Sequence, residues 1–312
     1  MDDRIKKNTM NLDNNLMKQF GNNLNKNVNL SNYSWFNLGG NAEYFFKAKD
    51  KNQLKFFLDE VKKENIDTLI LGAGSNTLFR DRGVKGAVIK LGKDFNFIKI
   101  IEKNVLEVGA ATLDRKVADY AKNNNLKGFE FLSCIPGSIG GAIIMNSGCY
   151  DHDISNILLS VTVLNKTNLE EIEVKKEEID FYYRGTNIPN DFIILSAKFE
   201  GTKGLKDDIE KTQIDFVERK KLSQPSQIKT CGSTFKNISK DKKAWRLIKD
   251  SGCEGFTEGD ATISKKHCNF FVNNGNAKSS DIENLINRVQ KRVFEKTGVS
   301  LELEIKIIGE KK

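Results

Sequence analysis

Apolar side chains recur first at helical and then at strand spacing along the first two thirds of the chain. Behind Asp50, a residue type that caps helices well, Leu54, Phe57, Leu58 and Val61 fall on one helical face. Further apolar runs predict a second helix over residues 113–121 and strands over 68–71, 84–91, 97–108, 158–164, 170–174 and 192–199. This rhythm of helices and strands predicts an α+β fold.

The composition changes over the charged stretch Lys203–Lys221, where apolar positions are sparse. We therefore place a domain boundary near residue 205. A chain of 312 residues is long for one core, so we expect two or three subdomains in all. Residues 1–30 are rich in Asn and Lys, and we interpret them as a weakly ordered lead-in.

Beyond the boundary, the pattern predicts a short helix at Ala244–Ile248 and a longer one ending at Gly298. Ser280 and Glu283 have the spacing of a capping box for the longer helix. The last segment alternates, which predicts a strand with Leu301, Leu303, Ile305 and Ile307 on one face and Glu302, Glu304 and Lys306 on the other.

Two glycine-rich loops follow apolar segments. The first is Gly72–Asn76, directly behind a predicted strand, and the second is Pro136–Ala142, which leads into a short predicted helix at Ile139–Met145. Glycine lets backbone amides approach and converge on an anion, and a helix N-terminus adds its dipole. The pair of loops indicates a diphosphate site, although each loop alone could also be a plain turn.

The two common nucleotide-binding patterns are absent. A Rossmann fingerprint needs a third glycine where Thr77 stands, and the residues that follow predict turn and strand rather than helix. Neither glycine cluster ends in the Gly-Lys-Ser/Thr of a phosphate-binding loop. A diphosphate must therefore be held by another architecture.

The formal net charge of +8 raises the question of nucleic-acid binding. The lysines are spread over the whole chain and are not interleaved with aromatic residues at one place, so we expect no nucleic acid. A basic surface with a small anionic substrate is the interpretation we favour. Compositional bias toward Asn and Lys explains the charge equally well.

The five cysteines form an odd set without Cys-x-x-Cys spacing. The chain has no signal peptide and no apolar stretch of membrane-spanning length. We therefore expect a reduced, cytoplasmic protein without membrane insertion.

The two histidines, His152 and His267, lack neighbours at zinc-like spacing, so we expect no metal site. No Gly-x-Ser-x-Gly motif accompanies them, which argues against a Ser-His-Asp hydrolase. Elimination leaves an organic cofactor as the expected source of reactivity.

Six motifs follow one another along the chain, within a match that covers roughly Tyr33 to Gly309: Leu71–Asn76, Ile135–Ala142 with Met145–Gly148, Tyr183-Arg184, Gly232–Asn237, Ser264–Phe270 and Leu301–Glu304. Together they resemble the motifs of the UDP-N-acetylenolpyruvoylglucosamine reductase family. The resemblance covers nearly the whole chain, and the ordered set is far more specific than any one motif.

The resemblance implies a p-cresol methylhydroxylase-type FAD-binding domain of two α+β subdomains at residues 31–204. A smaller α+β substrate-binding domain at 205–312 follows, with its last strand carrying Glu304 back to the active site. The implied cofactor is noncovalent FAD, not a flavin linked through Cys149 or His152. The implied reaction reduces UDP-N-acetylglucosamine enolpyruvate to UDP-N-acetylmuramate for peptidoglycan, with NADPH as hydride donor, and we expect a monomer.

By the same resemblance, the FAD-binding residues lie in the two glycine-rich loops and directly beside them. They are Gly72, Ala73, Gly74, Ser75, Asn76, Thr77, Ser133, Ile135, Pro136, Gly137, Ser138, Gly140, Gly141 and Ala142. The implied substrate ligands are Tyr183, Asn237 and Lys221.

The implied catalytic residues are Arg184, Ser233 and Glu304. Negative charge developing on an enolate-like intermediate calls for a fixed cation, and Arg184 matches that role. Ser233 matches the donor of the proton to carbon. Glu304 is expected to work with Arg184 beside the substrate carboxylate, as a protonated acid. Without the resemblance, each of the three would be interpreted as a surface or turn residue.

Two other functions stay open at this stage. One is a flavin oxidase or dehydrogenase of alcohols with the same fold, which oxygen consumption without a UDP-sugar would indicate. The other is a UDP-sugar-binding regulator that lost turnover, which binding without NADPH oxidation would indicate.

Overall fold

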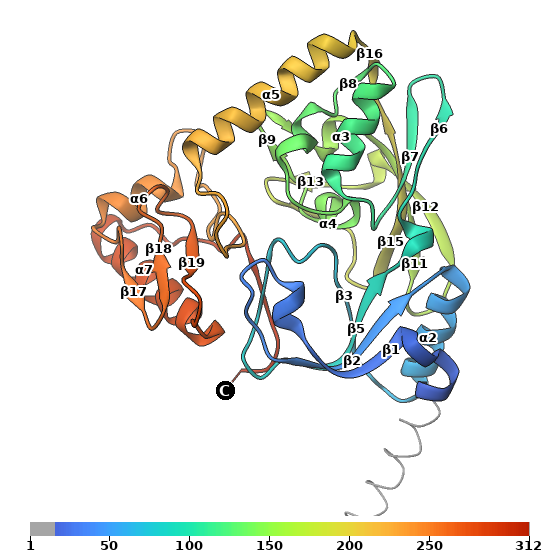
Figure 1. Ribbon diagram of the computed structural model, residues 1–312, viewed down its shortest axis with the longest axis horizontal. Coiled ribbons are helices and arrows are strands. Elements are labelled where there is room, and N and C mark those ends of the chain that lie inside the picture. Colours follow the sequence, from blue (N-terminus) through green and yellow to red (C-terminus); the bar gives the residue numbers. More distant parts are fainter. Residues whose placement is uncertain (1–15, 312) are drawn as a thin grey trace, which may run out of the picture.

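The computed structural model describes residues 16–311, and its first lobe is a four-stranded sheet covered by a helix (Figure 1). Strands β2 (Asn41–Ala48), β5 (Val84–Leu91) and β3 (Thr68–Ile70) run parallel, whereas β1 (Leu24–Asn29) pairs antiparallel with β2. The Asp50 carboxylate caps the predicted helix, α2 (Lys51–Lys63), by accepting a hydrogen bond from the Gln53 amide at 2.8 Å. The strand order in this sheet is β1, β2, β5 and β3.

From residue 16 onward the predicted lead-in, residues 1–30, packs against the first lobe. Leu16 and Phe20 are buried, and β1 is an edge strand of the first sheet. The Phe20 ring meets Phe46 of β2 and Phe57 of α2 edge-on, with centroid distances of 5.2 and 5.1 Å. The few apolar residues of this Asn/Lys-rich segment therefore complete the first core. Residues 1–15 lie outside the described residues.

The second lobe is a five-stranded antiparallel sheet. The apolar run predicted over residues 97–108 is a hairpin of two strands. Helices α3 (Asp114–Asn123) and α4 (Ile139–Ile144) and the 3₁₀ segment Glu130–Cys134 share one core with the sheet. The strand order is β12 (Glu171–Lys175), β11 (Leu158–Asn165), β15 (Phe192–Glu200), β7 (Val105–Gly109) and β6 (Ile98–Glu102).

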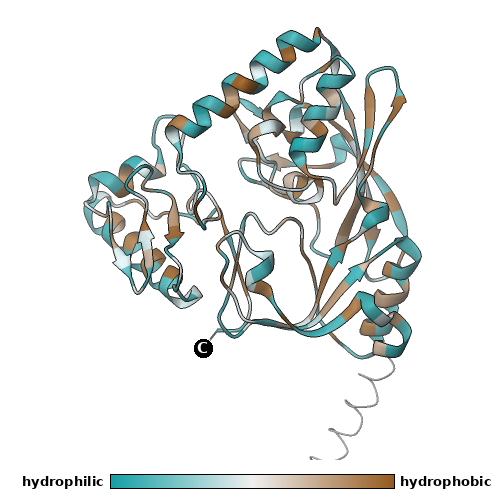
Figure 2. Ribbon diagram, in the orientation of Figure 1, coloured by the Kyte–Doolittle hydropathy of each residue, from teal (hydrophilic) through white to brown (hydrophobic). Residues whose placement is uncertain are grey.

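The charged stretch around the predicted boundary is one long helix, α5 (Lys206–Ser223). It is mainly hydrophilic in Figure 2, but Ile209 and Phe216 are buried, and Phe216 belongs to the core of the second lobe. The Gln213 side chain donates a hydrogen bond to the Ala118 carbonyl of α3 at 3.0 Å. Because α5 packs as part of the second lobe, this packing favours a domain break after Ser223 rather than near residue 205.

The third lobe packs α6 (Ala244–Asp250) and α7 (Ser279–Thr297) with a small antiparallel sheet. Both helices agree with the prediction, and Gly298 ends α7 in the left-handed region at φ 69°. Phe36 and Leu38, which precede β2, are buried in this C-terminal core. The sheet consists of β17 (Thr257–Glu258), β18 (Ala261–Ile263) and β19 (Phe271–Asn273).

The start of α7 differs from the predicted capping box. The backbone amides of Ser279 and Ser280 donate to the Asp81 carboxylate, at 2.8 and 3.0 Å. Glu283 instead pairs with Arg80, with Nε–Oε1 at 3.0 Å. The helix is thus capped by a residue of the first lobe, a partner 199 residues away from Ser280 that local sequence cannot reveal.

The C-terminal segment returns to the first lobe. Residues Lys306–Ile308 form β20, which runs parallel to β4 (Thr77–Phe79). The predicted strand is therefore shorter than expected, because residues 301–305 lie outside it and pair with the third lobe, through the bridge between Leu303 and Phe235 and backbone hydrogen bonds from Lys236 to Glu302 and from Glu304 to Thr234. No helix within residues 16–311 is long and apolar enough to cross a membrane. The remaining short strand pairs are β8 (Leu126–Lys127) with β16 (Thr202–Lys203), β9 (Gly148–Cys149) with β10 (His152–Asp153), and β13 (Phe181–Tyr182) with β14 (Gly185–Thr186).

Candidate functional site

A cavity of about 1330 Å³ lies where the three lobes meet. Both glycine-rich loops line it, as do Arg184 of the second lobe and Ser233 and Glu304 of the C-terminal part. All predicted cofactor-binding residues line this cavity except Ser133. Residues that are far apart in sequence therefore meet at one place, as the ordered motifs predicted.

The two glycine-rich loops are tied to each other. The first connects β3 with β4, and the second leads into α4 through Ser138. The Ser75 hydroxyl donates a hydrogen bond to the Pro136 carbonyl at 2.8 Å, which joins the two loops directly. A single wall of backbone thus runs from the first lobe to the second.

The glycines of this wall serve different purposes. Gly74 has φ 70°, and a Cβ there would lie 1.8 Å from the Tyr33 carbonyl oxygen, so the fold itself requires glycine at this position. Gly141 lies in α4, and a Cβ there would meet nothing within 4 Å. Because Gly141 also lines the cavity, its missing side chain leaves room for a ligand rather than for the protein.

Buried polar atoms at the wall have no hydrogen-bond partner among the described residues. They are the Ser138 hydroxyl and both carboxyl oxygens of Asp114. Ser138 and Asp114 line the cavity, and burial raises the pKa of Asp114 well above its ordinary value. Buried polar atoms normally have partners, so this wall is suited to a polar ligand such as the diphosphate of FAD.

Arg184 is held in an uncommon backbone conformation, with φ 61°. Its Nε donates to Glu304 Oε1 at 3.0 Å, and its Nη2 donates to the Gly148 carbonyl at 3.0 Å. The guanidinium also lies 4.8 Å from the centre of the Tyr183 ring. These contacts fix the cation in the cavity instead of leaving it in solvent.

Glu304 is positioned by both neighbouring lobes. Its backbone amide donates to the Thr234 carbonyl at 2.8 Å, and its carbonyl accepts from Asn76 Nδ2 at 3.0 Å. Asn76 belongs to the first glycine-rich loop, so this loop and the loop that carries Ser233 both hold Glu304. Burial raises the pKa of the Glu304 carboxyl, and the nearby Arg184 opposes this rise. A raised pKa fits the protonated acid predicted for Glu304.

Ser233 lies in a loop fixed by Asn269. The buried Asn269 side chain accepts from the Phe235 amide at 2.9 Å and donates to the Phe235 carbonyl at 2.8 Å. The Asn269 backbone carbonyl accepts from the Thr234 amide at 2.8 Å, and Ser233 itself bridges to Phe270. The motif Ser264–Phe270 therefore contributes the support for the Ser233 loop.

The predicted substrate ligands lie apart from the residues that line the cavity. Tyr183 and Asn237 contact each other, with Asn237 Nδ2 donating to the Tyr183 hydroxyl at 3.1 Å, but neither lines the cavity. Lys221 is exposed, and its backbone carbonyl accepts from Lys266. Its neighbour Lys220 lines the cavity instead, with its ammonium on the Cys134 carbonyl.

Sequence reasoning missed several ionisable residues of the cavity wall, among them Lys90, Asp114 and Lys220. Lys90 donates to the Gly72 carbonyl at 2.7 Å and so fixes the first loop. A signal existed for Lys220, which follows Phe216 by four residues and so lies on the same face of α5. No sequence signal marked Lys90 or Asp114, because lysine in a strand and aspartate in the first turn of a helix are ordinary.

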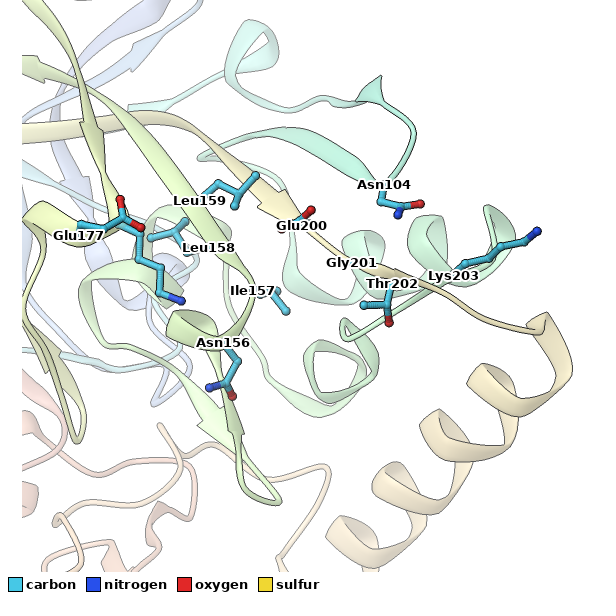
Figure 3. A pocket seen from close by; sticks show the side chains of 11 residues that line it. Asn104, Asn156, Ile157, Leu158, Leu159, Glu177, Glu200, Gly201, Thr202 and Lys203 are labelled. Atoms are coloured by element: carbon cyan, nitrogen blue, oxygen red, sulfur yellow. The ribbon is translucent and has the colours of Figure 1, made fainter.

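A second cavity, of about 490 Å³, lies in the second lobe away from both glycine-rich loops. Figure 3 shows its lining, in which Asn104, Asn156 and Thr202 accompany charged side chains of both signs. Neither the catalytic candidates nor the unpartnered polar atoms line it. The larger cavity is therefore the candidate site.

Two family models match the chain. One, described as an FAD binding domain, matches residues 42–168, and one, described as the C-terminal domain of UDP-N-acetylenolpyruvoylglucosamine reductase, matches residues 224–308. The second match begins where packing favours the domain break. The predicted boundary near residue 205 stays a prediction.

Similar proteins agree over nearly the full chain. A UDP-N-acetylenolpyruvoylglucosamine reductase of Pelagibacter ubique (strain HTCC1062) is 44% identical over 299 residues, which cover 94% of this chain and 98% of the relative. One of Orientia tsutsugamushi (strain Ikeda) is 42% identical and covers 92% of this chain and 94% of the relative. The crystal structure of the Thermus caldophilus reductase (MurB) superposes with a TM-score of 0.79 at 30% identity, covering 90% of this chain and 98% of that one.

The fold, the two loops and these matches define an FAD-dependent oxidoreductase. The predicted fold class, an FAD-binding domain followed by a smaller α+β domain, is confirmed. The chain belongs to the UDP-N-acetylenolpyruvoylglucosamine reductase family.

Proposed function

We propose that this chain reduces UDP-N-acetylglucosamine enolpyruvate to UDP-N-acetylmuramate, a peptidoglycan precursor, with FAD as cofactor and NADPH as hydride donor. The observation that carries the proposal is the convergence of Arg184, Ser233 and Glu304 on the cavity that the two glycine-rich loops line. Family membership supports the reaction, and the geometry supports the role of each residue.

The glycine-rich loops would hold FAD without a covalent bond. The backbone of Gly72–Thr77 and of Pro136–Ala142 faces the cavity, and Ser138 offers a buried hydroxyl without another partner among the described residues. FAD, when bound, would supply hydride transfer from NADPH to the terminal carbon of the enolpyruvyl group. The chain therefore has to place that group and stabilise the charge that develops on it.

Arg184 and Glu304 stabilise this charge as a unit. The guanidinium is preorganised by Glu304 and the Gly148 carbonyl, so it binds the substrate carboxylate without reorganising. Glu304 keeps Arg184 oriented, and its raised pKa favours a neutral acid that does not repel the developing anion.

Ser233 donates the proton to the carbon next to the carboxylate. Its loop is braced by Asn269, and its chain neighbour Thr234 is hydrogen-bonded to the backbone of Glu304. The proton donor and the charge-stabilising pair are thus fixed relative to each other. Tyr183, Asn237 and Lys221 remain the proposed substrate ligands, and we add Lys220 for the diphosphate because it lines the cavity.

An anaerobic titration tests the proposal. The purified protein is expected to be yellow, to bleach with NADPH and to regain its colour on addition of UDP-N-acetylglucosamine enolpyruvate. A protein that oxygen alone recolours is an oxidase of this fold, and one that binds the UDP-sugar without oxidising NADPH is a regulator. Either result, or a colourless protein that FAD does not colour, overturns the proposal.

We also propose that the enzyme acts as a monomer in the cytoplasm. The free state of all five cysteines supports a reducing compartment. Light scattering behind a size-exclusion column gives the mass directly, and a dimer mass would contradict the proposed monomer.

A further inference from the structure

The flavin cavity, which is the larger cavity that both glycine-rich loops line, has two thiols in direct contact in its wall. The sulfur atoms of Cys134 and Cys149 lie 3.0 Å apart, although 15 residues separate them in sequence. Cys134 ends the 3₁₀ segment Glu130–Cys134, and Cys149 lies in the short strand β9, which packs beside it. A disulfide needs sulfurs about 2.05 Å apart, so closing this pair requires a movement of only about 1 Å.

The surroundings give the two thiols different reactivity. The two thiols share a hydrogen bond, and this contact together with the positive charge of Lys220 lowers the pKa of Cys134. The pKa of Cys149 is raised, because its proton is held by Cys134. One sulfur is thus the better nucleophile, and the other keeps a proton to give away.

We propose that Cys134 and Cys149 form a peroxide-reactive dithiol site at the wall of the flavin cavity, which closes to a disulfide. Cys149 lines the cavity, so a small oxidant that enters it reaches the pair. Peroxide is the oxidant expected there, because flavins that lack their substrate can pass electrons to dioxygen. The other three cysteines, Cys231, Cys253 and Cys268, have no sulfur contact of this kind in the described part of the chain.

The chemistry balances within the pair and the peroxide. The Cys134 thiolate attacks one peroxide oxygen, the O–O bond breaks, and hydroxide leaves with the proton that Cys134 had released, as water. Cys134 is now a sulfenic acid. Cys149 then attacks that sulfur, its proton joins the departing hydroxide as a second water, and the S–S bond forms. Two electrons pass from the two sulfurs to the peroxide.

The disulfide would join the two backbone positions that hold the cations of the site. Arg184 donates to the carbonyl of Gly148, the residue before Cys149, and Lys220 donates to the carbonyl of Cys134. Formation of the disulfide would therefore shift the carbonyl groups that accept hydrogen bonds from Arg184 and Lys220. It is chemically separate from hydride transfer and does not require that the reductase reaction be the true one.

The test counts free thiols in the FAD-loaded protein before and after brief exposure to dilute hydrogen peroxide. Denaturation with N-ethylmaleimide is expected to label all five cysteines before treatment and three after it, with dithiothreitol restoring five. Peptide mapping is expected to find the peptides of Cys134 and Cys149 linked, with a loss of two hydrogens. Five labels after treatment, or a linked pair that contains another cysteine, would overturn the proposal.

Two variants separate this site from nonspecific oxidation. Cys149→Ser should form no disulfide, and dimedone should instead trap a sulfenic acid on Cys134. Cys253→Ser, which removes a buried thiol of the third lobe, should still lose two thiols on treatment. If dimedone labels Cys253 or Cys268 as readily as Cys134, the proposed reactivity of the pair is wrong.

Discussion

The glycine-rich loops and the proposed catalytic residues face one cavity, yet they are built in opposite ways. The loops present backbone from two short contiguous segments, and the side chains of Ser138 and Asp114 behind them have no partner among the described residues. Arg184, Ser233 and Glu304 come from three distant segments, and hydrogen bonds within the protein already hold Arg184 and Glu304. The cofactor half needs a ligand to satisfy its polar atoms, whereas the catalytic half is preorganised before anything binds.

Replacing the proton donor should break the catalytic half and spare the cofactor half. In Ser233→Ala, reoxidation of the flavin by substrate is expected to slow about 10³-fold, because the proposed proton donor is lost. Flavin reduction by NADPH should stay within a factor of about two. Stopped-flow absorbance measures the two half-reactions separately. Equal losses in both would mean that Ser233 positions the flavin and does not donate the proton.

Two glycines of the cofactor half should respond in opposite ways. Gly74→Ala places a Cβ against the Tyr33 carbonyl at a positive φ, and we expect it to cost about 3 kcal/mol of folding stability. Gly141→Ala meets no protein atom and should stabilise the FAD-free fold by about 0.5 kcal/mol as a helix residue, while weakening FAD binding at least about 10-fold.

Urea unfolding of the FAD-free protein and fluorescence titration with FAD measure these two effects. Unchanged FAD affinity in Gly141→Ala would show that the cofactor does not approach this part of α4. A normal stability of Gly74→Ala would contradict the close approach of the first loop to Tyr33.

The protonation state of Glu304 gives a further test of the catalytic half of the cavity. Burial raises its pKa, so the neutral acid persists to a higher pH than for an ordinary glutamate, and reoxidation should fall as pH rises through this pKa. Glu304→Gln keeps a neutral side chain and should lose this pH dependence, with a rate within about 10-fold of the wild type. The exposed neighbour Glu302 gives the matched control, Glu302→Gln. A Glu304→Gln profile that still falls with pH assigns the titration to another group.

The same contrast explains what could be predicted from the sequence. The helices α2 and α7, most strands and both glycine-rich loops were predictable, because local periodicity and glycine content encode them. Arg184, Ser233 and Glu304 were found only through the ordered family motifs. Glu304 alternates with apolar neighbours like any surface residue, and its burial arises from contacts with Asn76 and Thr234 far away in sequence.

What sequence reasoning missed depends on long-range packing. The N-terminal segment is ordered because Phe20 meets Phe46 and Phe57, although its composition resembles a flexible tail. The cap of α7 comes from Asp81, so Glu283 was free to pair with Arg80. No local pattern marks such partners, since each residue type is ordinary at its own position.

The smallest expected effect concerns the buried acid behind the loops. The folded-state pKa of Asp114 lies well above its unfolded value of about 3.8, because burial disfavours the charged form. The folded state thus binds a proton more tightly, so the contribution of Asp114 to stability is complete below the unfolded pKa. It is lost as pH rises through the folded pKa. Asp114→Asn stays neutral, so its unfolding free energy should vary less with pH over that range.

The difference between the two proteins should grow with pH, in favour of Asp114→Asn in the FAD-free state. Urea unfolding at a series of pH values measures it, and Asp119→Asn on the exposed face of α3 is the control. A difference that shrinks with pH would mean that Asp114 is ionised in the folded protein. The polar atoms behind the loops would then hold charge instead of a neutral acid, and the contrast between the two halves of the cavity would have to be drawn from the backbone alone.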